Sequence, residues 1–170
     1  MKQLFTLFLL VFLSCNMNNS NTVNTINQDP NDINAIKKML SNQQECWNNG
    51  DIDGFMQGYW NSEELIFTSL NHKPTYGWKN TLERYRNSYP NKESMGEFKF
   101  EILDLKLTSS STSTVKGKWE LIRENDNPNG LFWLAIDKID ANWLIIKDST
   151  ISFEINIPLS LLECDKNNPS

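Results

Sequence analysis

The stretch FKFEILDLKL, residues 98–107, decides the fold class of this chain. Apolar and polar residues alternate over residues 98–102, as they do in a half-buried β-strand, and alternate again over residues 103–107 one step out of phase. A change of parity inside a strand is what one inserted residue produces, so the pattern predicts a β-bulge and a bend near residues 102–103. A bent strand curves the sheet that contains it.

After this strand the alternating pattern continues to the end of the expected domain. Short polar or Gly-containing segments interrupt it and predict turns. The turns are expected at residues 109–113, 125–130 and 140–142, and the strands between them at 115–124, 131–136 and 143–153. Long strands joined by short loops predict an antiparallel meander.

Before residue 98 the apolar residues follow a helical period. Asp29 followed by Pro30 is typical of a helix start, and apolar residues then recur at helical spacing from Ile33 to Trp47. The pattern further predicts a short helix from residue 51, a strand over 65–70, a turn over 71–74 and a third helix over 78–89. Helices followed by a curved sheet predict an α+β fold with the helices on one face of the sheet.

The first residues of the chain resemble a bacterial lipoprotein signal. Residues 4–13 form a run that is apolar except for Thr6, follows Lys2 and ends at Ser14-Cys15. The run is shorter than the roughly 20 residues that a membrane-spanning helix needs. Its junction resembles the lipobox that signal peptidase II cuts, which implies that residues 1–14 are removed and that Cys15 carries lipid. An ordinary secretory signal with an incidental cysteine is the alternative.

We therefore expect a protein of the bacterial cell envelope, held by membrane lipid at Cys15. The outer membrane facing the periplasm is the expected place, with the cell surface as an alternative. Residues 15–28 are rich in Asn and carry no charge, which is typical of a flexible tether. The folded domain is expected over residues 29–155 and a C-terminal tail over 156–170.

Composition and single residues narrow the function classes. The net charge of −5 argues against a nucleic acid partner, because phosphate binding needs a basic face. His72 is the only histidine and has no partner at metal-ligand spacing, so we expect no metal site and no cofactor. Cys46 and Cys164 are compatible with a disulfide in an oxidising compartment and equally with two buried thiols.

Five segments carry a resemblance to a known family. They are WNNGD at 47–51 with Phe55 and Tyr59 behind it, Gly77 before the third helix, GKW at 117–119, GLF at 130–132 and WLIIKDST at 143–150. Their order and spacing resemble the SnoaL-like, domain-of-unknown-function branch of the nuclear transport factor 2-like (NTF2-like) superfamily over residues 32–153. The resemblance implies a cone-shaped α+β barrel, in which a bent antiparallel sheet wraps round three N-terminal helices and leaves a pocket at the wide end. It also implies homodimers, formed through the sheet face.

Enzymes of this superfamily use side chains that this chain lacks at the matching positions. Relatives often end with Asp-His-Thr or Asp-His-Ser, whereas this chain has Asp148-Ser149-Thr150 and so lacks the imidazole base. Ketosteroid isomerases carry an aspartate base on the strand after the second helix, where this chain has Phe67 or Thr68. The two absences favour binding over catalysis.

Two charged residues of the expected strands are candidates for the pocket. Asp148 shares parity with the apolar Leu144 and Ile146, and if that face lines the cone its pKa should be raised by desolvation. The alternative is that the strand is ending and Asp148 bonds a loop or caps the first helix. Arg123 shares parity with Trp119 and either enters the same space or reaches water.

Aromatic residues are too many for the core of one small domain, since each buries on the order of 150–250 Å². The set comprises Trp47, Tyr59, Trp60, Trp78, Tyr85, Trp119 and Trp133. The pocket candidates are Trp47, Tyr59, Trp78, Tyr85, Trp119, Arg123, Trp133 and Asp148. The leading hypothesis is an envelope-anchored lipoprotein that binds a small apolar or cyclic ligand. The alternatives are a cofactor-independent isomerase, cyclase or dehydratase that uses Asp148, and an interaction module that uses the outer sheet face.

Overall fold

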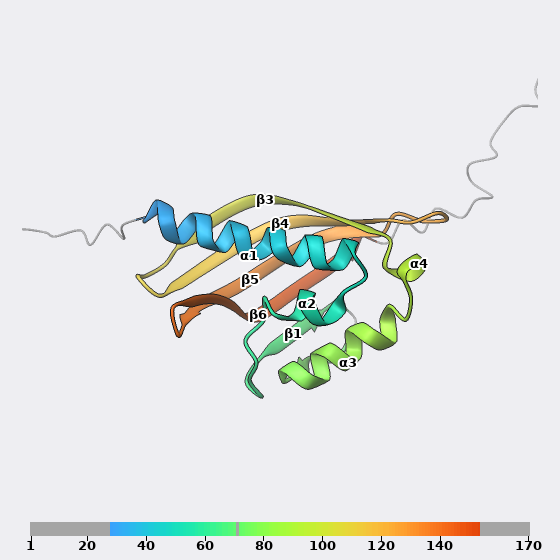
Figure 1. Ribbon diagram of the computed structural model, residues 1–170, viewed down its shortest axis with the longest axis horizontal. Coiled ribbons are helices and arrows are strands. Elements are labelled where there is room, and N and C mark those ends of the chain that lie inside the picture. The colour runs from blue at the N-terminus through green and yellow to red at the C-terminus, as the bar shows by residue number, and fades with distance from the viewer. Residues whose placement is uncertain (1–27, 71, 154–170) are drawn as a thin grey trace, which may run out of the picture.

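A computed structural model describes residues 28–70 and 72–153. Four helices and six strands occur in it (Figure 1). The helices are α1 (Pro30–Asn48), α2 (Ile52–Met56), α3 (Trp78–Ser88) and α4 (Lys92–Met95), and the strands are β1 (Ile66–Ser69), β2 (Thr75–Tyr76), β3 (Glu97–Leu107), β4 (Thr112–Ile122), β5 (Asn129–Ile139) and β6 (Asn142–Phe153). The expected α+β class is confirmed.

The strands form one curved sheet in the order β2-β1-β6-β5-β4-β3. The predicted antiparallel meander is present in β3 to β6. The expectation of a wholly antiparallel sheet is wrong, because β1 pairs with β6 in parallel. These two strands are far apart in the sequence, so no tight turn dictates their relative direction. The sheet is also not a closed barrel, since β2 and β3 are its free edges.

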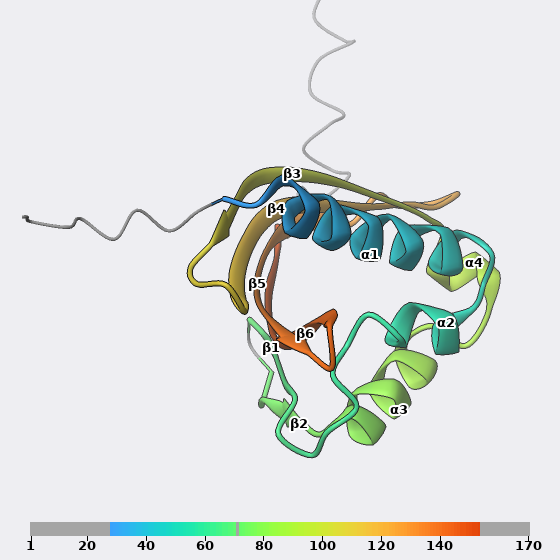
Figure 2. The ribbon, with the colours of Figure 1, turned by 60° about the vertical axis from the view of Figure 1, so that its left-hand side comes forward.

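The helices lie on the concave side of the curved sheet and cover it. In Figure 2, α1 crosses the hollow of the sheet on one side, and α2 and α3 lie at the other. Helix α1 begins as predicted, with the Asp29 side chain accepting a hydrogen bond from the Asn31 backbone N–H at 2.9 Å. The short helix α4 was not predicted, because its only sequence signal is a capping box between Asn91 and Ser94.

Two bulges shape the long strands. The predicted bulge in β3 is confirmed: the register with β4 shifts between Ile102 and Asp104, which leaves Leu103 unpaired and 43% exposed. A second shift, between Ala135 and the residue after it, leaves Ile146 of β6 without a partner in β5. Each bulge reverses which residues of its strand point toward the helices.

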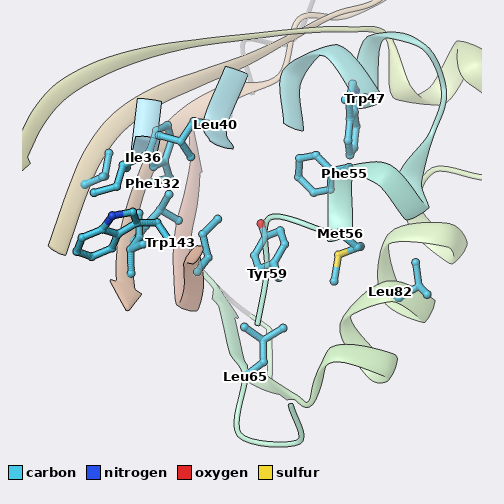
Figure 3. Close-up of a cluster of buried hydrophobic side chains, with 14 of the residues drawn as sticks. Ile36, Leu40, Trp47, Phe55, Met56, Tyr59, Leu65, Leu82, Phe132 and Trp143 are labelled. Carbon is cyan, nitrogen blue, oxygen red and sulfur yellow. The ribbon is translucent and has the colours of Figure 1, made fainter. Parts of the chain in front are cut away.

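The core runs the length of the hollow between α1 and the sheet. Figure 3 shows Ile36, Phe132 and Trp143 at one end of this core, and Trp47 with Phe55 toward the other. Trp143 is 4% exposed, as predicted, and its indole N–H donates to Asp32 Oδ1 at 3.0 Å.

A side chain covers the end of edge strand β3. The Gln28 side-chain amide donates to the Leu107 carbonyl at 2.9 Å, and its oxygen accepts from the Leu107 N–H, also at 2.9 Å. One side chain thus reproduces both hydrogen bonds of a neighbouring strand at this residue.

Several expectations fall on residues that the structure does not describe. The signal, the lipidated Cys15, Cys164 and the tail over 156–170 lie outside the described residues. Cys46 is half-buried on α1. Among the described helices, none has a stretch long and apolar enough to cross a membrane.

Candidate functional site

A cavity of about 710 Å³ lies between the concave face of the sheet and the helices. Helices α1, α2 and α3 contribute to its wall, as do all strands except β2. The hollow seen between α1, α3 and the sheet in Figure 2 therefore contains open space besides the packed core.

Aromatic rings in edge-to-face contact form one wall of the cavity. Trp47 lies 5.1 Å from Phe55 and 4.8 Å from Tyr89 between ring centroids. Tyr85 lies 5.2 Å from Phe55 and 5.7 Å from Phe67. Each ring fixes the orientation of its neighbours, so this wall is rigid and offers ring faces and edges to a ligand.

Asp148 is the one carboxylate that the described residues contribute to the wall of this cavity. It is 6% exposed, and its Oδ2 accepts a hydrogen bond from the Tyr59 hydroxyl at 2.7 Å. The Tyr59 oxygen lies 3.3 Å from the Tyr85 hydroxyl oxygen, which extends the polar chain. The other carboxylate oxygen, Oδ1, is buried and has no hydrogen-bond partner among the described residues.

Burial controls the ionisation of this group. Desolvation raises the pKa of Asp148 to about 6, although the hydrogen bond from Tyr59 acts in the opposite direction by stabilising the carboxylate. Burial also raises the pKa of Tyr59 well above its usual value, with the Asp148 charge adding to the effect. At neutral pH the pair is therefore a carboxylate and a neutral phenol donor.

The bulge in β6 turns Asp148 into the cavity. Trp143 and Ile145 point toward the helices, whereas Leu144 and Ile146 are half-buried on the opposite face. The prediction that Asp148 shares a face with Leu144 and Ile146 is therefore wrong. The inserted residue changes the parity, so Asp148 lies on the same face as Ile145, and its side chain is desolvated as expected.

Glycines in β4 and β5 make room for two large rings of the cavity wall. Gly130 pairs directly with Trp119, and a Cβ atom there would lie 2.8 Å from the Trp119 indole nitrogen and would also meet the Ile151 carbonyl. Gly117 pairs with Phe132, and a Cβ atom there would overlap that ring. The glycines of the GKW and GLF segments thus leave space for the side chains of Phe132 and Trp119, respectively.

Five of the eight predicted pocket residues line the cavity and three do not. Those in its wall are Trp47, Tyr59, Tyr85, Trp119 and Asp148. The predictions for Trp78, Trp133 and Arg123 are wrong. Trp78 donates its indole N–H to the Met56 carbonyl at 3.0 Å and belongs to the helix packing.

The other two corrections follow from strand geometry. Trp133 alternates with the inward Phe132 and Leu134, so it lies on the outer face, 38% exposed, with the Lys116 ammonium 5.6 Å from its ring centroid. Arg123 follows the end of β4, where its guanidinium pairs with Asp126 at 2.7 Å instead of entering the cavity.

Sequence reasoning missed several polar residues of the wall, among them Gln43 and Arg84. Gln43 of α1 is 5% exposed and donates to the Phe55 carbonyl at 2.9 Å. It lies three residues after Leu40 and four before Trp47, so the helical spacing could have placed it on the buried face. Arg84 of α3 also lines the cavity. Apart from its position next to Tyr85, nothing in the sequence indicates that Arg84 lines a cavity.

The residues described provide no cluster of three or more His, Cys, Asp or Glu side chains that could hold a metal ion. His72 lies at the cavity wall but is exposed.

Comparison with known proteins identifies the family. No protein-family model and no curated protein matches the sequence. Among solved structures, an NTF2-like protein of unknown function from Shewanella oneidensis MR-1 is 43% identical, with a TM-score of 0.68, over 71% of this chain and 98% of that one.

Two more distant structures share the fold. A ketosteroid isomerase-like protein from Erwinia carotovora atroseptica SCRI1043 is 12% identical, with a TM-score of 0.61, over 74% of this chain and 98% of that one. A domain of unknown function with a cystatin-like fold from Nostoc punctiforme PCC 73102 is 16% identical, with a TM-score of 0.64, over 78% and 84%. Through its Shewanella relative, the chain belongs to the NTF2-like family.

Proposed function

We propose that the cavity binds a small, largely apolar, ring-containing molecule that donates a hydrogen bond to Asp148. The observation that carries the proposal is the buried Oδ1 of Asp148, which has no partner among the described residues and belongs to a cavity wall built of aromatic rings. An unpaired buried carboxylate oxygen costs free energy, so a ligand hydroxyl or amide that donates to it recovers that cost.

The size and chemistry of the cavity support this class of ligand. A volume of about 710 Å³ lies inside the range that binds drug-sized molecules. The edge-to-face rings of Trp47, Phe55 and Tyr85 suit the face or edge of a flat ring system.

A matched pair of neutral probes tests the hydrogen bond. 2-Naphthol donates through its hydroxyl, whereas 2-methoxynaphthalene has the same rings and no donor. We expect calorimetric titration to give tighter binding of 2-naphthol to the wild-type chain. Asp148→Leu removes the acceptor and should abolish the preference, while Asp148→Asn keeps a carbonyl oxygen and should retain most of it. Equal affinities in all three proteins would refute the role of Asp148.

A second pair of variants tests the location. Trp119 lines the cavity, whereas Trp133 lies on the outer face of the same sheet. Trp119→Ala should weaken 2-naphthol binding, and Trp133→Ala should leave it unchanged, with circular dichroism confirming that both variants fold. The opposite result would move the site to the outer face of the sheet.

Acid–base catalysis is the second candidate function. It is favoured by the raised pKa of Asp148, since a carboxylate that titrates at about 6 is a stronger base than an ordinary aspartate and is still ionised at pH 7. The name of the ketosteroid isomerase-like relative points the same way. Against it, the Tyr59 hydroxyl already donates to Asp148 and is not free to stabilise an oxyanion.

Proton exchange on a ring ketone distinguishes the two functions. If Asp148 removes a proton from the carbon next to a carbonyl group, 2-tetralone dissolved in D₂O should gain deuterium at that carbon faster with the protein than without it. Asp148→Asn should then slow the catalysed exchange by about 10²–10⁴-fold. Binding of 2-tetralone with no catalysed exchange would leave binding as the function.

We also propose that lipid at Cys15 anchors the protein in a bacterial envelope, on the strength of the apolar run that precedes this cysteine.

A homodimer through the outer face of the sheet is a separate proposal, which the exposed Trp133 on that face supports. Sedimentation velocity tests it by comparing wild-type protein with Trp133→Glu. A carboxylate buried at the interface should shift the protein to monomer. A wild-type protein that is monomeric at every concentration would refute it.

A further inference from the structure

Arg84 of α3 brings a positive charge to the wall of an otherwise mostly apolar cavity. Its Cζ atom lies 4.9 Å from the centroid of the Phe67 ring, and one guanidinium nitrogen donates to the Ser69 hydroxyl oxygen at 3.1 Å. The ring below and the serine at one side hold the guanidinium in place. It is half-buried, so its charge is screened less than a surface charge.

No carboxylate neutralises this arginine in the part of the chain that the structure describes. None of the ion pairs within 4.0 Å involves Arg84. Arg86, two residues further along the same helix, is bound by both carboxylate oxygens of Asp53 at 2.7 and 2.8 Å, outside the cavity. Helix α3 therefore carries one arginine with a carboxylate partner and one, at the cavity wall, that has no carboxylate partner among the described residues.

The guanidinium has hydrogen-bonding capacity to spare. It has five N–H donors, and its one side-chain hydrogen bond among the described residues uses a single nitrogen. Ser69 accepts that bond, so its own hydroxyl proton is available to another acceptor. Ser88, one helical turn beyond Arg84, also lines the cavity. This group of donors matches the oxygens of a carboxylate, which a guanidinium binds in bidentate fashion.

The cavity wall thus contains two opposite charges that do not pair with each other. Asp148 is directly opposite Phe67 in the β1–β6 pairing, and Arg84 covers the Phe67 ring. Within residues 28–70 and 72–153, no group donates a hydrogen bond to Oδ1 of the buried Asp148, and no carboxylate pairs with the half-buried Arg84. A ligand that satisfies both groups has an acidic group at one end and a donor at the other.

We infer that the cavity selects ring compounds with a carboxylate or similar acidic group, which Arg84 binds with the help of Ser69. This inference rests on the proposed function and narrows the ligand class from ring-containing molecules in general to ring-containing organic acids. The aromatic wall holds the ring, Arg84 fixes the acidic end, and Asp148 accepts from a donor on the remaining part of the molecule.

Naphthalene-2-carboxylate and naphthalene-2-carboxamide are suitable probes, because they share shape and differ in charge. Calorimetric titration of the full chain at pH 7.5 should show the carboxylate binding about tenfold or more tightly than the carboxamide. Arg84→Gln should remove this preference, because carboxylate binding weakens more than carboxamide binding. Arg84→Lys should keep part of it, since the charge remains and the fork of donors is lost. Arg86→Gln is the matched control and should retain the wild-type ratio.

The outcomes separate this inference from the proposed function. If both probes bind equally to wild-type protein, or if Arg84→Gln retains the preference, the inference is refuted while the aromatic binding site stands. If Arg86→Gln loses the preference as well, general surface charge is responsible and Arg84 is not the binding residue. If neither probe binds while 2-naphthol does, the inference fails and the proposed function stands; if 2-naphthol does not bind either, both fail.

Discussion

Asp148→Asn should change how the stability of the protein depends on pH. Burial raises the pKa of Asp148 from 3.8 to about 6, so the folded state holds this proton more tightly than the unfolded state does. Between these two values the folded state binds more protons. The stability that the protonated group contributes is therefore fully present below pH 3.8 and is lost as the pH rises through about 6.

The size of this effect follows from the two pKa values. One pKa unit corresponds to 1.36 kcal/mol, so the whole shift amounts to about 3 kcal/mol of stability, of which about 2.4 kcal/mol is lost between pH 4 and pH 8. No reduction for solvent screening is needed, because the side chain is 6% exposed. Asparagine carries no titrating proton, so the variant should lack this loss.

Urea denaturation followed by tryptophan fluorescence measures the difference. The free energy of unfolding of Asp148→Asn minus that of wild type should rise by about 2.4 kcal/mol from pH 4 to pH 8, with most of the change between pH 4 and pH 6. Groups whose pKa values the substitution does not change contribute equally to the free energy of unfolding of both proteins, so their contributions cancel in the difference. Parallel curves for the two proteins would refute the reasoning.

Tyr59→Phe sharpens the same test. The Tyr59 hydroxyl lowers the pKa of Asp148 by donating to its carboxylate. Without that donor the pKa should rise further, and the ¹³C resonance of the Asp148 carboxyl should titrate at a higher pH than in wild type. A lower midpoint in the variant would mean that the phenol does not stabilise the carboxylate.

Three other substitutions test the fold and the anchor. Trp143→Ala should cost about 3–5 kcal/mol of unfolding free energy, because the side chain is 4% exposed, and nearly unchanged melting would contradict its place in the core. Gly130→Ala should destabilise the protein and alter Trp119 fluorescence, since the new methyl group meets the indole and the Ile151 carbonyl; a stability equal to wild type would show that the strands separate at little cost. Cys15→Ala should release processed protein from membranes or leave it unprocessed, and a processed variant that still sediments with membranes would exclude lipid anchoring.

The sequence predicted those parts of the fold that have a local cause. The Asp29-Pro30 start of α1 and the parity change at Leu103 are both visible in a few consecutive residues, and both are confirmed. The parallel pairing of β1 with β6 could not be predicted in this way, because it joins segments about 80 residues apart with no connecting turn to fix their direction.

The candidate site was predicted only in part for a similar reason. Asp148 was correctly predicted to be buried, but it was assigned to the wrong face of β6. The bulge at Ile146 is defined by the pairing of β6 with β5 and cannot be recognised from the sequence of β6 alone. Trp133 and Trp119 are the same residue type in neighbouring strands, and only the register shows that one faces outward and the other inward. Arg84 was missed because nothing in the sequence distinguishes an arginine that lines a cavity from one on the solvent-exposed face of a helix.

The Gln28 contact with Leu107 determines where a tether would pull on the domain. Leu107 ends β3, whereas the cavity residues Phe98 and Phe100 lie near its beginning, about 23–30 Å away along the strand. In Figure 1 the start of α1 and the end of β3 lie on the same side of the domain, and α4 lies on the other. A domain held through the residues before Gln28 would therefore hang from the end remote from Phe98 and Phe100, and mechanical tension would act first on the two amide hydrogen bonds of Gln28 rather than on the walls of the cavity.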